Sequence, residues 1–430
     1  MVKPRFIIQI MLTDDTLVKN VAACEGLAED SVRSGVENGT IVIPYNLKRR
    51  RKIEPKGIGK RLLTKVNANI GTSPSIADIE NEKAKLAAAI EAGADTVMDL
   101  STGGNIDEVR REIVAASTIP VGTVPIYQAA CDAPKKQKSF IELTVDEIFE
   151  GIAKHLEDGV DFLTIHTGIT RAGVERLRHR KRLAGIVSRG GAMMVEWMIR
   201  NKRENPLAEH FDRLLDLTRE YGACLSLGDG LRPGALHDAS DRAQIQELLI
   251  IGEQVDAARA KGVQVMVEGP GHVPLDQIQM NMQLQLQICH GAPFYVLGPL
   301  VTDVAPGYDH IVSAIGGAVA AMHGADFLCY VTPSEHLGLP NVEDVRVGTV
   351  VTKIAAHAAD VAKYPERARK RDEKVSRLRE EFKWDEMIAE SIDPVEARRK
   401  FDRYPKEAEN ECTMCGEFCA IKRSKEALSG

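Results

Sequence analysis

The chain is poor in aromatic residues and has no large excess of either charge. Phe, Trp and Tyr make up 5% of its 430 residues, too few for a barrel with aromatic girdles or for a platform on which nucleic-acid bases stack. The 56 Lys and Arg against 62 Asp and Glu give a net charge of −6, which argues against a nucleic-acid-binding or membrane-binding protein. No segment reaches the roughly 20 apolar residues of a spanning helix. With 44% hydrophobic residues, the composition indicates an α/β protein with a packed core.

Cysteines are few and unevenly placed. Five of the eight are scattered along the chain, as is typical of proteins in a reducing cytoplasm, and we expect that location. The other three form the motif C-x2-C-x3-C at Cys412, Cys415 and Cys419. The nearest upstream histidine, His357, is over fifty residues away. Three thiolates without a nearby fourth ligand favour a 4Fe–4S cluster with one open iron over a closed structural zinc site.

A unit of strand, loop and amphipathic helix repeats from residue 62 to about residue 325. The expected strands are Leu63–Ile70, Thr96–Leu100, Gly122–Tyr127, Phe162–His166, Gly185–Ser188, Cys224–Leu227, Gln264–Glu268 and Phe294–Leu297. Eight such units predict an α/β fold of the (β/α)8 TIM-barrel type over residues 62–340. The competing fold, an open doubly wound sheet, lacks its G-x-G-x-x-G after the first strand. We expect a small N-terminal region over 1–61, a helical extension over 341–403 and a cluster-binding tail over 404–430.

Polar or otherwise unusual residues stand at the end of every expected strand, where a barrel of this type has its active site. They are Asn69, Met98, Tyr127, His166, Ser188, Asp229, Glu268 and Tyr295. Each alone has a structural explanation, since a histidine at a strand end is more often a hydrogen-bonded structural group than a ligand. The presence of such residues at all eight strand ends favours a functional site instead.

Three local patterns suggest what this site binds. Ser188-Arg189-Gly190-Gly191 has the composition of a phosphate cradle, because Gly lets the backbone approach an anion and Arg offers it a planar fork. Asp229 and Arg232 either pair with each other or divide their work between sugar hydroxyls and an anion. His272 and His336 are candidate ligands for Zn²⁺ or a similar divalent ion, although sequence separation alone does not bring them together.

Nine strings, in order, resemble the phosphomethylpyrimidine synthase (ThiC) family from about residue 37 onwards. Among them are "NANIGTS" at 67–73, "GIVSRGG" at 185–191, "SLGDGLRPG" at 226–234, "VQVMVEGPGHVP" at 263–274 and "CTMCGEFCAIK" at 412–422. The resemblance implies a non-classical radical S-adenosylmethionine (SAM) lyase. Such an enzyme rearranges 5-aminoimidazole ribotide to 4-amino-5-hydroxymethyl-2-methylpyrimidine phosphate in thiamine biosynthesis.

The resemblance also implies roles for individual residues. The ribotide site would comprise Asn69, Met98, Tyr127, His166, Ser188, Arg189, Gly190, Asp229, Gly230, Leu231, Arg232, Glu268 and Tyr295. Within that set, His166, Glu268 and Tyr295 would be the catalytic residues. His272 and His336 would hold the divalent metal, and Cys412, Cys415 and Cys419 the 4Fe–4S cluster that binds SAM. The implied partners are a reducing protein such as flavodoxin or ferredoxin and a second copy of the chain, with C-terminal tails exchanged in a homodimer.

Three alternatives stay open at this point. The paralogous 5-hydroxybenzimidazole synthase shares the fold, cluster and substrate, and "IPYN" at 43–46 in place of the family's usual "IPAN" leaves room for it. A zinc-dependent barrel lyase or hydrolase would use Glu268, His272 and His336, with zinc in the tail. A non-catalytic assembly protein is disfavoured, because it has no use for buried charged residues at the strand ends.

Overall fold

A computed structural model describes residues 15–179, 181–404 and 412–428. By their contacts the residues divide into two compact units, Met1–Ala359 and Asp360–Gly430. The boundary lies inside helix α15 (Val342–Lys363). The predicted domain limits at residues 61, 340 and 403 stay predictions.

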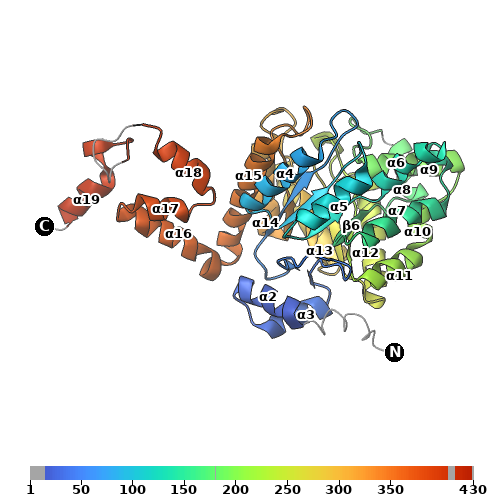
Figure 1. Ribbon diagram of the computed structural model, residues 1–430, viewed down its shortest axis with the longest axis horizontal. Helices are drawn as coiled ribbons and strands as arrows, with labels where there is room; N and C mark the ends of the chain where they lie inside the picture. Colours follow the sequence, from blue (N-terminus) through green and yellow to red (C-terminus); the bar gives the residue numbers. More distant parts are fainter. Residues whose placement is uncertain (1–14, 180, 405–411, 429–430) are drawn as a thin grey trace. The chain divides into compact units, whose positions relative to one another are not determined.

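The first unit contains a closed barrel of eight parallel strands, as the repeating sequence pattern predicts (Figure 1). Its strands, in barrel order, are β3 (Lys65–Ile70), β4 (Thr96–Asp99), β5 (Val121–Thr123), β6 (Phe162–Ile165), β7 (Cys224–Leu227), β8 (Val265–Gly269), β9 (Phe294–Leu297) and β10 (Phe327–Cys329). β10 closes the barrel by pairing with both β9 and β3. The (β/α)8 prediction is therefore confirmed.

Helices surround the barrel because each strand is followed by a segment with one apolar face (Figure 1). They are α4 (Ile79–Glu91), α5 (Ile106–Ala116), α6 (Ile126–Asp132), α7 (Val145–Glu157), α8 (Arg171–His179), α9 (Arg189–Asn201), α10 (Pro206–Glu209), α11 (Phe211–Tyr221), α12 (Arg242–Ala260), α13 (Ile278–Ile288) and α14 (Asp309–His323). Short 3-10 turns lie at η1 (Pro134–Lys136), η2 (Phe140–Glu142), η3 (Leu236–Asp238) and η4 (Leu275–Gln277). Among the described residues, no helix has both the length and the apolar character needed to cross a bilayer.

Two strand predictions are corrected. Residues 185–188 form no strand, because Gly185 takes a φ of +68° and Ser188 caps helix α9. The backbone N–H groups of Leu183 and Ala184 donate to the Asp238 carboxylate rather than to a neighbouring strand. The eighth strand is instead β10, whose three residues are too few to show a period. The strand predicted through Tyr127 ends at Thr123, which places Tyr127 in α6.

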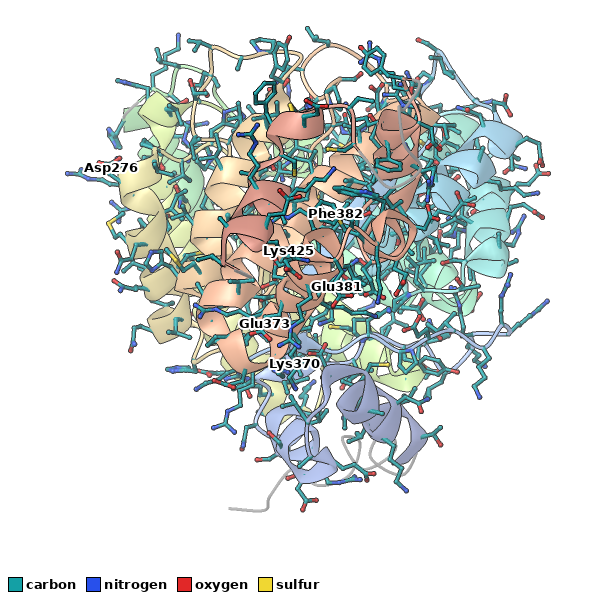
Figure 2. The ribbon with its side chains drawn as sticks, turned by 90° about the vertical axis from the view of Figure 1, so that its left-hand side faces the viewer. Asp276, Lys370, Glu373, Glu381, Phe382 and Lys425 are labelled. Atoms are coloured by element: carbon teal, nitrogen blue, oxygen red, sulfur yellow. The ribbon has the colours of Figure 1, made fainter. Side chains whose placement is uncertain are left out.

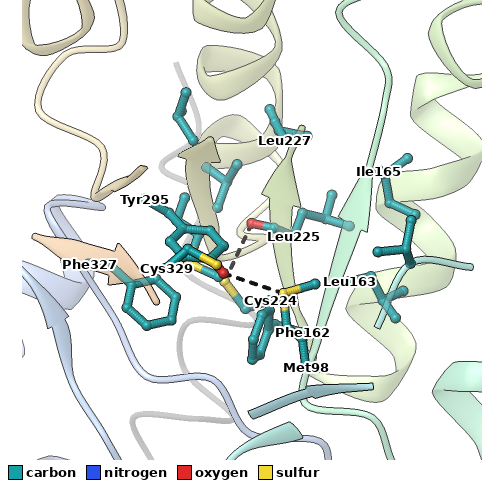
Figure 3. Close-up of a cluster of buried hydrophobic side chains, with 14 of the residues drawn as sticks. Met98, Phe162, Leu163, Ile165, Cys224, Leu225, Leu227, Tyr295, Phe327 and Cys329 are labelled. Carbon is teal, nitrogen blue, oxygen red and sulfur yellow. Dashed lines mark hydrogen bonds between the residues drawn. The ribbon is translucent and has the colours of Figure 1, made fainter. Parts of the chain in front are cut away.

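The barrel interior is filled by side chains from several strands, among them β4, β6, β9 and β10 (Figure 3). The rings of Tyr295 and Phe327 stack at 4.2 Å between centroids, and Phe162 meets Phe327 edge-on at 6.4 Å. Gly122 on β5 makes room for this packing, since a Cβ there would lie 2.2 Å from the Phe162 ring. The packed interior leaves the carboxyl end of the barrel as the place for a cavity.

The N-terminal region packs at the opposite end of the barrel. It consists of α2 (Asp15–Glu25), α3 (Glu29–Glu37) and the antiparallel pair β1 (Ile41–Val42) and β2 (Ile58–Gly59), with an apolar cluster of its own. The N–H of Ile43 donates to the Gln264 side chain just before β8, and the N–H of Asn46 donates to Asp161 just before β6. These bonds tie the region to the amino ends of the strands, away from the predicted site.

The second unit is helical and charged. It contains the end of α15, α16 (Pro365–Glu380), α17 (Trp384–Ala389), α18 (Pro394–Phe401), η5 (Gly416–Phe418) and α19 (Ala420–Leu428). Lys425 on α19 reaches Glu380 at 2.8 Å and lies 5.6 Å from the ring centroid of Phe382, beside which it is labelled in Figure 2. α19 thereby packs on the end of α16, directly after the three clustered cysteines.

Candidate active site

A cavity of about 380 Å³ opens at the carboxyl ends of the barrel strands, a size typical of small-molecule sites. The predicted ribotide residues that line it are Asn69, Met98, Tyr127, His166, Ser188, Arg189, Asp229, Arg232, Glu268 and Tyr295. Gly190, Gly230 and Leu231, predicted for the same site, are not in its lining. The fold thus brings most of the predicted set together around one space, and the assignment of ribotide contacts stays a prediction.

Glycines next to the lining let its loops approach closely. A Cβ on Gly190 would lie 2.4 Å from the His166 ring, and one on Gly230 would lie 2.3 Å from Ile169. Leu231 is fully buried. Gly190, Gly230 and Leu231 therefore lie behind the lining residues, where they allow the loops of the cavity wall to pack closely.

The N-terminus of α9 forms part of the cavity wall. Ser188 is its N-cap residue, and its Oγ accepts the N–H of Gly191 at 3.1 Å. The same Oγ lies 3.1 Å from His166 Nε2. Arg189 stacks on the Tyr127 ring, with its guanidinium carbon 4.8 Å from the centroid. The Ser188 hydroxyl, the positive end of the helix dipole and the Arg189 guanidinium thus meet at the cavity wall.

His166 is held as a neutral imidazole. It is 3% exposed, and burial, with a further contribution from Arg232, lowers its pKa to about 3. Its Nδ1 is buried and has no hydrogen-bond partner among the described residues. The ring therefore carries no charge at neutral pH, and its Nε2 is the nitrogen that contacts the Ser188 hydroxyl.

Glu268 lies on the inner face of β8, and its environment favours the protonated form. The hydroxyls of Thr164 and Ser226 both donate to its Oε1, at 2.6 and 2.8 Å. Burial raises the pKa of Glu268, and these two bonds only partly oppose that rise. Because Oε1 already accepts two bonds, Oε2 is left for a ligand or a proton.

Asp229 and Arg232 form an ion pair in the loop after β7. Arg232 donates to Asp229 Oδ1 at 3.1 Å. Burial raises the pKa of Asp229, Arg232 opposes the rise and the nearby Glu268 adds to it. The pairing, one of the two alternatives that the sequence left open, is thus present, and both residues also line the cavity.

Tyr295 takes part in a network of neutral groups on the floor of the cavity. Asn67 donates to Tyr295 Oη at 2.8 Å, and that hydroxyl lies 3.6 Å from the Met98 sulfur, a contact drawn in Figure 3. Asn69 donates to the Cys329 sulfur at 3.0 Å. Burial raises the pKa of Tyr295 well above its usual value and that of Cys329 to about 12. Both side chains are therefore protonated at neutral pH.

His272 and His336 are brought together by the fold. Their ring centroids are 5.4 Å apart. Each Nδ1 is bonded to a carboxylate, His272 to Asp303 at 2.7 Å and His336 to Asp309 at 2.8 Å. Carboxylates that orient imidazoles in this way are typical of histidine metal ligands.

The three tail cysteines belong to the second unit and form no disulfide. Cys415 is exposed, whereas Cys412 and Cys419 are half-buried, on either side of η5. Across the described residues, no group of three His, Cys, Asp or Glu side chains converges on a point that would suit a single metal ion. A four-iron cluster makes a different demand, because each thiolate binds its own iron. Three free thiols in one short segment provide that donor set.

Several functional candidates are missing from the sequence predictions. Thr164, Cys329 and Glu335 line the cavity, while Asp303 and Asp309 hold the two histidines. Thr164 precedes His166 by two residues. Because side chains alternate between the two faces of a strand, the sequence alone could have placed Thr164 on the same face as His166. Cys329 lies on the strand that the pattern did not reveal. Asp303 lies in a loop and Asp309 is the first residue of α14, and only the fold brings each of them to its histidine.

Comparison with known proteins places the chain in a family. The sequence model of the radical SAM ThiC family matches residues 12–426, beginning earlier than the expected residue 37. The phosphomethylpyrimidine synthase of Desulforamulus reducens is 58% identical over 407 residues, covering 95% of this chain and 94% of its own. Those of Desulforudis audaxviator and Geobacter metallireducens are 58% and 55% identical, covering 96% and 98% of this chain and 95% and 96% of their own. The chain belongs to the radical SAM ThiC family.

Proposed function

We propose that this chain is a phosphomethylpyrimidine synthase. It converts 5-aminoimidazole ribotide to 4-amino-5-hydroxymethyl-2-methylpyrimidine phosphate in thiamine biosynthesis. The observation that carries the proposal is the 58% identity, over 95% of the chain, to a relative with this activity in its name. The polar cavity at the carboxyl end of the barrel supports it with room for a sugar phosphate. The free thiols are typical of a reducing cytoplasm, where we place the enzyme.

The ribotide phosphate binds at the N-terminus of α9. The backbone N–H groups there, the Ser188 hydroxyl and the Arg189 guanidinium supply donors to a dianion. Asp229, held by Arg232, accepts from the ribose hydroxyls. A phosphate at the α9 side of the cavity and a ribose beside Asp229 direct the imidazole ring toward Glu268 and Tyr295, which line the same space.

The remaining lining residues control protons around the imidazole. Neutral His166 forms a hydrogen bond without adding charge, since burial lowers its pKa to about 3. Glu268, whose pKa burial raises, takes or gives a proton at Oε2. Tyr295 stays a neutral phenol that donates one hydrogen bond. His166, Glu268 and Tyr295 are accordingly our proposed catalytic residues.

Cys412, Cys415 and Cys419 hold the iron–sulfur cluster that the family implies. Their free thiols fit this role, and their number leaves one iron of a 4Fe–4S cluster for SAM. When bound and reduced, the cluster with SAM supplies the 5′-deoxyadenosyl radical that begins the rearrangement. The barrel residues contribute by holding the ribotide in place and excluding water from it.

His272 and His336 hold a divalent metal ion, which we propose to be Zn²⁺. The orienting bonds from Asp303 and Asp309 leave Nε2 of each ring for the ion. Two protein ligands leave further positions for a substrate or cofactor atom, which the ion would polarise. The neighbouring Glu335 lines the cavity, which brings this segment to the substrate site.

We also propose that two copies of the chain form a homodimer with exchanged C-terminal tails, reduced by a flavodoxin-like or ferredoxin-like protein. Separate compact units for the barrel and the cysteine tail are compatible with such an exchange. Small-angle scattering and sedimentation of the anaerobic protein test the dimer. Complementation between an Arg189→Ala copy and a Cys412→Ala copy tests the exchange, because only a mixed dimer with swapped tails has one intact site.

The reaction itself is tested by incubating anaerobically reconstituted, reduced protein with ribotide and SAM. We expect 5′-deoxyadenosine and a product with the mass of the hydroxymethylpyrimidine phosphate. The mass of 5-hydroxybenzimidazole would assign the paralogous reaction instead. Zinc without iron or sulfide, together with no SAM cleavage, would contradict the radical enzyme.

A further inference from the structure

Glu247 lies behind the candidate active site and is not part of the cavity lining described above. It lies on α12 and is 2% exposed. Its Oε2 accepts the N–H of Leu231 at 2.8 Å, and its carboxyl group is also bonded to the N–H of Gly230. These two residues stand between Asp229 and Arg232 in the loop after β7. Glu247 therefore fixes the backbone of the segment that presents both side chains to the cavity.

Two carboxyl oxygens in this region are buried without a partner. They are Glu247 Oε1 and Asp229 Oδ2, and neither has a hydrogen-bond partner among the described residues. Glu247 and Asp229 line one small cavity of about 20 Å³, which has room for a single water molecule. Two buried carboxylate oxygens are costly without a donor, and both can be satisfied by one proton.

The nearby cations do not provide the missing donor. Arg182 donates to Asp241 and to the carbonyl oxygens of Leu231 and Arg232. Arg232 donates to Asp229 Oδ1, the oxygen that is already satisfied. The third carboxyl of the region, Glu268, accepts from Thr164 and Ser226. Among the described residues, neither Arg182 nor Arg232 therefore donates a hydrogen bond to Glu247 Oε1 or Asp229 Oδ2.

We propose that Glu247 is a positioning residue that acts as a neutral carboxylic acid. It accepts the two backbone N–H groups on one side and donates its proton toward Asp229 Oδ2 on the other, directly or through one water. Asp229 then presents an oriented anion to the ribose hydroxyls. The inference rests on the proposed function through the role given to Asp229.

The electrostatics of the region agree with this geometry. Burial raises the pKa of Glu247 well above its usual value, and the neighbouring Asp229 adds to the rise. A second anion at Glu247 would repel Asp229 within the same buried space. One proton between the two groups removes that repulsion and leaves a single negative charge to face Arg232.

The test compares Glu247→Gln with Glu247→Ala in the cluster-reconstituted enzyme. Gln keeps an oxygen for the two N–H groups and supplies an amide donor for Asp229, so we expect its affinity for ribotide, measured by calorimetry, to stay within about threefold of wild type. Ala removes both bonds, and we expect an affinity at least about tenfold weaker. Glu253→Gln is the matched control, because Glu253 is exposed on the same helix.

Infrared spectroscopy reports the proton independently of activity. We expect the spectrum of wild type minus Glu247→Gln to contain the C=O band of a protonated carboxylic acid, absent when Glu253→Gln is subtracted. No such band, or a Gln variant that binds ribotide as weakly as the Ala variant, would overturn the inference. If the Ala variant does not fold, the inference is decided by the infrared band and by the affinity of Glu247→Gln for ribotide. Failure of wild type to bind ribotide would instead overturn the proposed function.

Discussion

Asp99, at the end of β4, shows how burial changes a carboxyl group near the cavity. It is 6% exposed, and its Oδ1 accepts both the N–H and the hydroxyl of Ser101. Burial outweighs these two bonds and raises the pKa of Asp99 to about 6. The folded protein therefore binds this proton more tightly than the unfolded chain, in which an aspartate has a pKa of about 3.9.

From this difference we predict that Asp99 makes the protein less stable as pH rises from about 4 to about 6. Over this range the native state holds the proton that the unfolded state has lost, so the free energy of unfolding falls, by about 3 kcal/mol in total. Asp99→Asn removes this contribution. Urea unfolding at several pH values measures this. The free energy of unfolding of the variant, relative to that of wild type, should increase between pH 4 and 6 and stay constant above pH 6.

The control for this prediction is Asp276→Asn. Asp276 is exposed on η4 and is labelled at the edge of the molecule in Figure 2. Its substitution should leave the pH dependence of unfolding unchanged. Parallel stability curves for wild type and Asp99→Asn would show that Asp99 ionises in the folded protein as it does in the unfolded chain.

At Arg189, the contribution of the positive charge to ligand binding can be separated from that of the planar guanidinium. Its guanidinium stacks on Tyr127 at the start of α9. Arg189→Lys keeps the charge but loses the stacking and the bidentate fork, so we predict an affinity for ribotide weaker by about tenfold or more. Calorimetry with ribotide and with its dephosphorylated riboside measures this, and the loss should be confined to the phosphorylated ligand. Arg200→Lys, exposed near the other end of the same helix, should bind as wild type does.

At the scale of elements, α9 depends on a glycine where it meets the loop after β7. A Cβ on Gly191 would lie 2.2 Å from the carbonyl oxygen of Gly230, a backbone atom that cannot rotate away. We predict that Gly191→Ala shifts the N-terminus of α9, lowers the free energy of unfolding by about 1–3 kcal/mol and weakens ribotide binding. Gly338→Ala is the control, since nothing lies within 4 Å of its added Cβ. Equal melting temperatures and affinities for both variants would contradict the clash.

The elements also show what a sequence pattern can and cannot reveal. Strands such as β6 and β7 were predictable because each is a run of four buried residues, three of them apolar, between turn signals. No pattern indicates β10, which has only three residues, whereas Gly185–Ser188 has the composition of a strand although Ser188 caps α9. The total of eight was nevertheless right, because the repeat of strand and helix constrains the number more than any one segment does.

The candidate site was predictable to a similar extent and for a related reason. Residues at the ends of correctly placed strands, such as Asn69 and Glu268, line the cavity as expected. Tyr127 lines it from a helix rather than a strand. Glu247 and Asp303 act through contacts between segments far apart in the sequence, and no local pattern indicates those contacts.

At the scale of the whole molecule, the cavity and the cluster motif belong to different compact units. The lining residues lie within Met1–Ala359, and the three cysteines lie within Asp360–Gly430. The barrel has its own closed sheet and core, and neither includes any of the three tail cysteines. Loss of the cluster should therefore abolish the reaction without unfolding the barrel.

We predict this outcome for Cys412→Ala. The variant should lose the visible absorbance of the cluster and all release of 5′-deoxyadenosine, because two thiolates cannot retain a cluster that needs three. Its main thermal transition should stay within a few degrees of wild type, and its affinity for ribotide within about threefold, since the barrel residues are untouched. Cys24→Ala, at an exposed cysteine on α2, should keep both cluster and activity. Global unfolding of the Cys412 variant would instead identify the tail as a structural metal site on which the barrel depends.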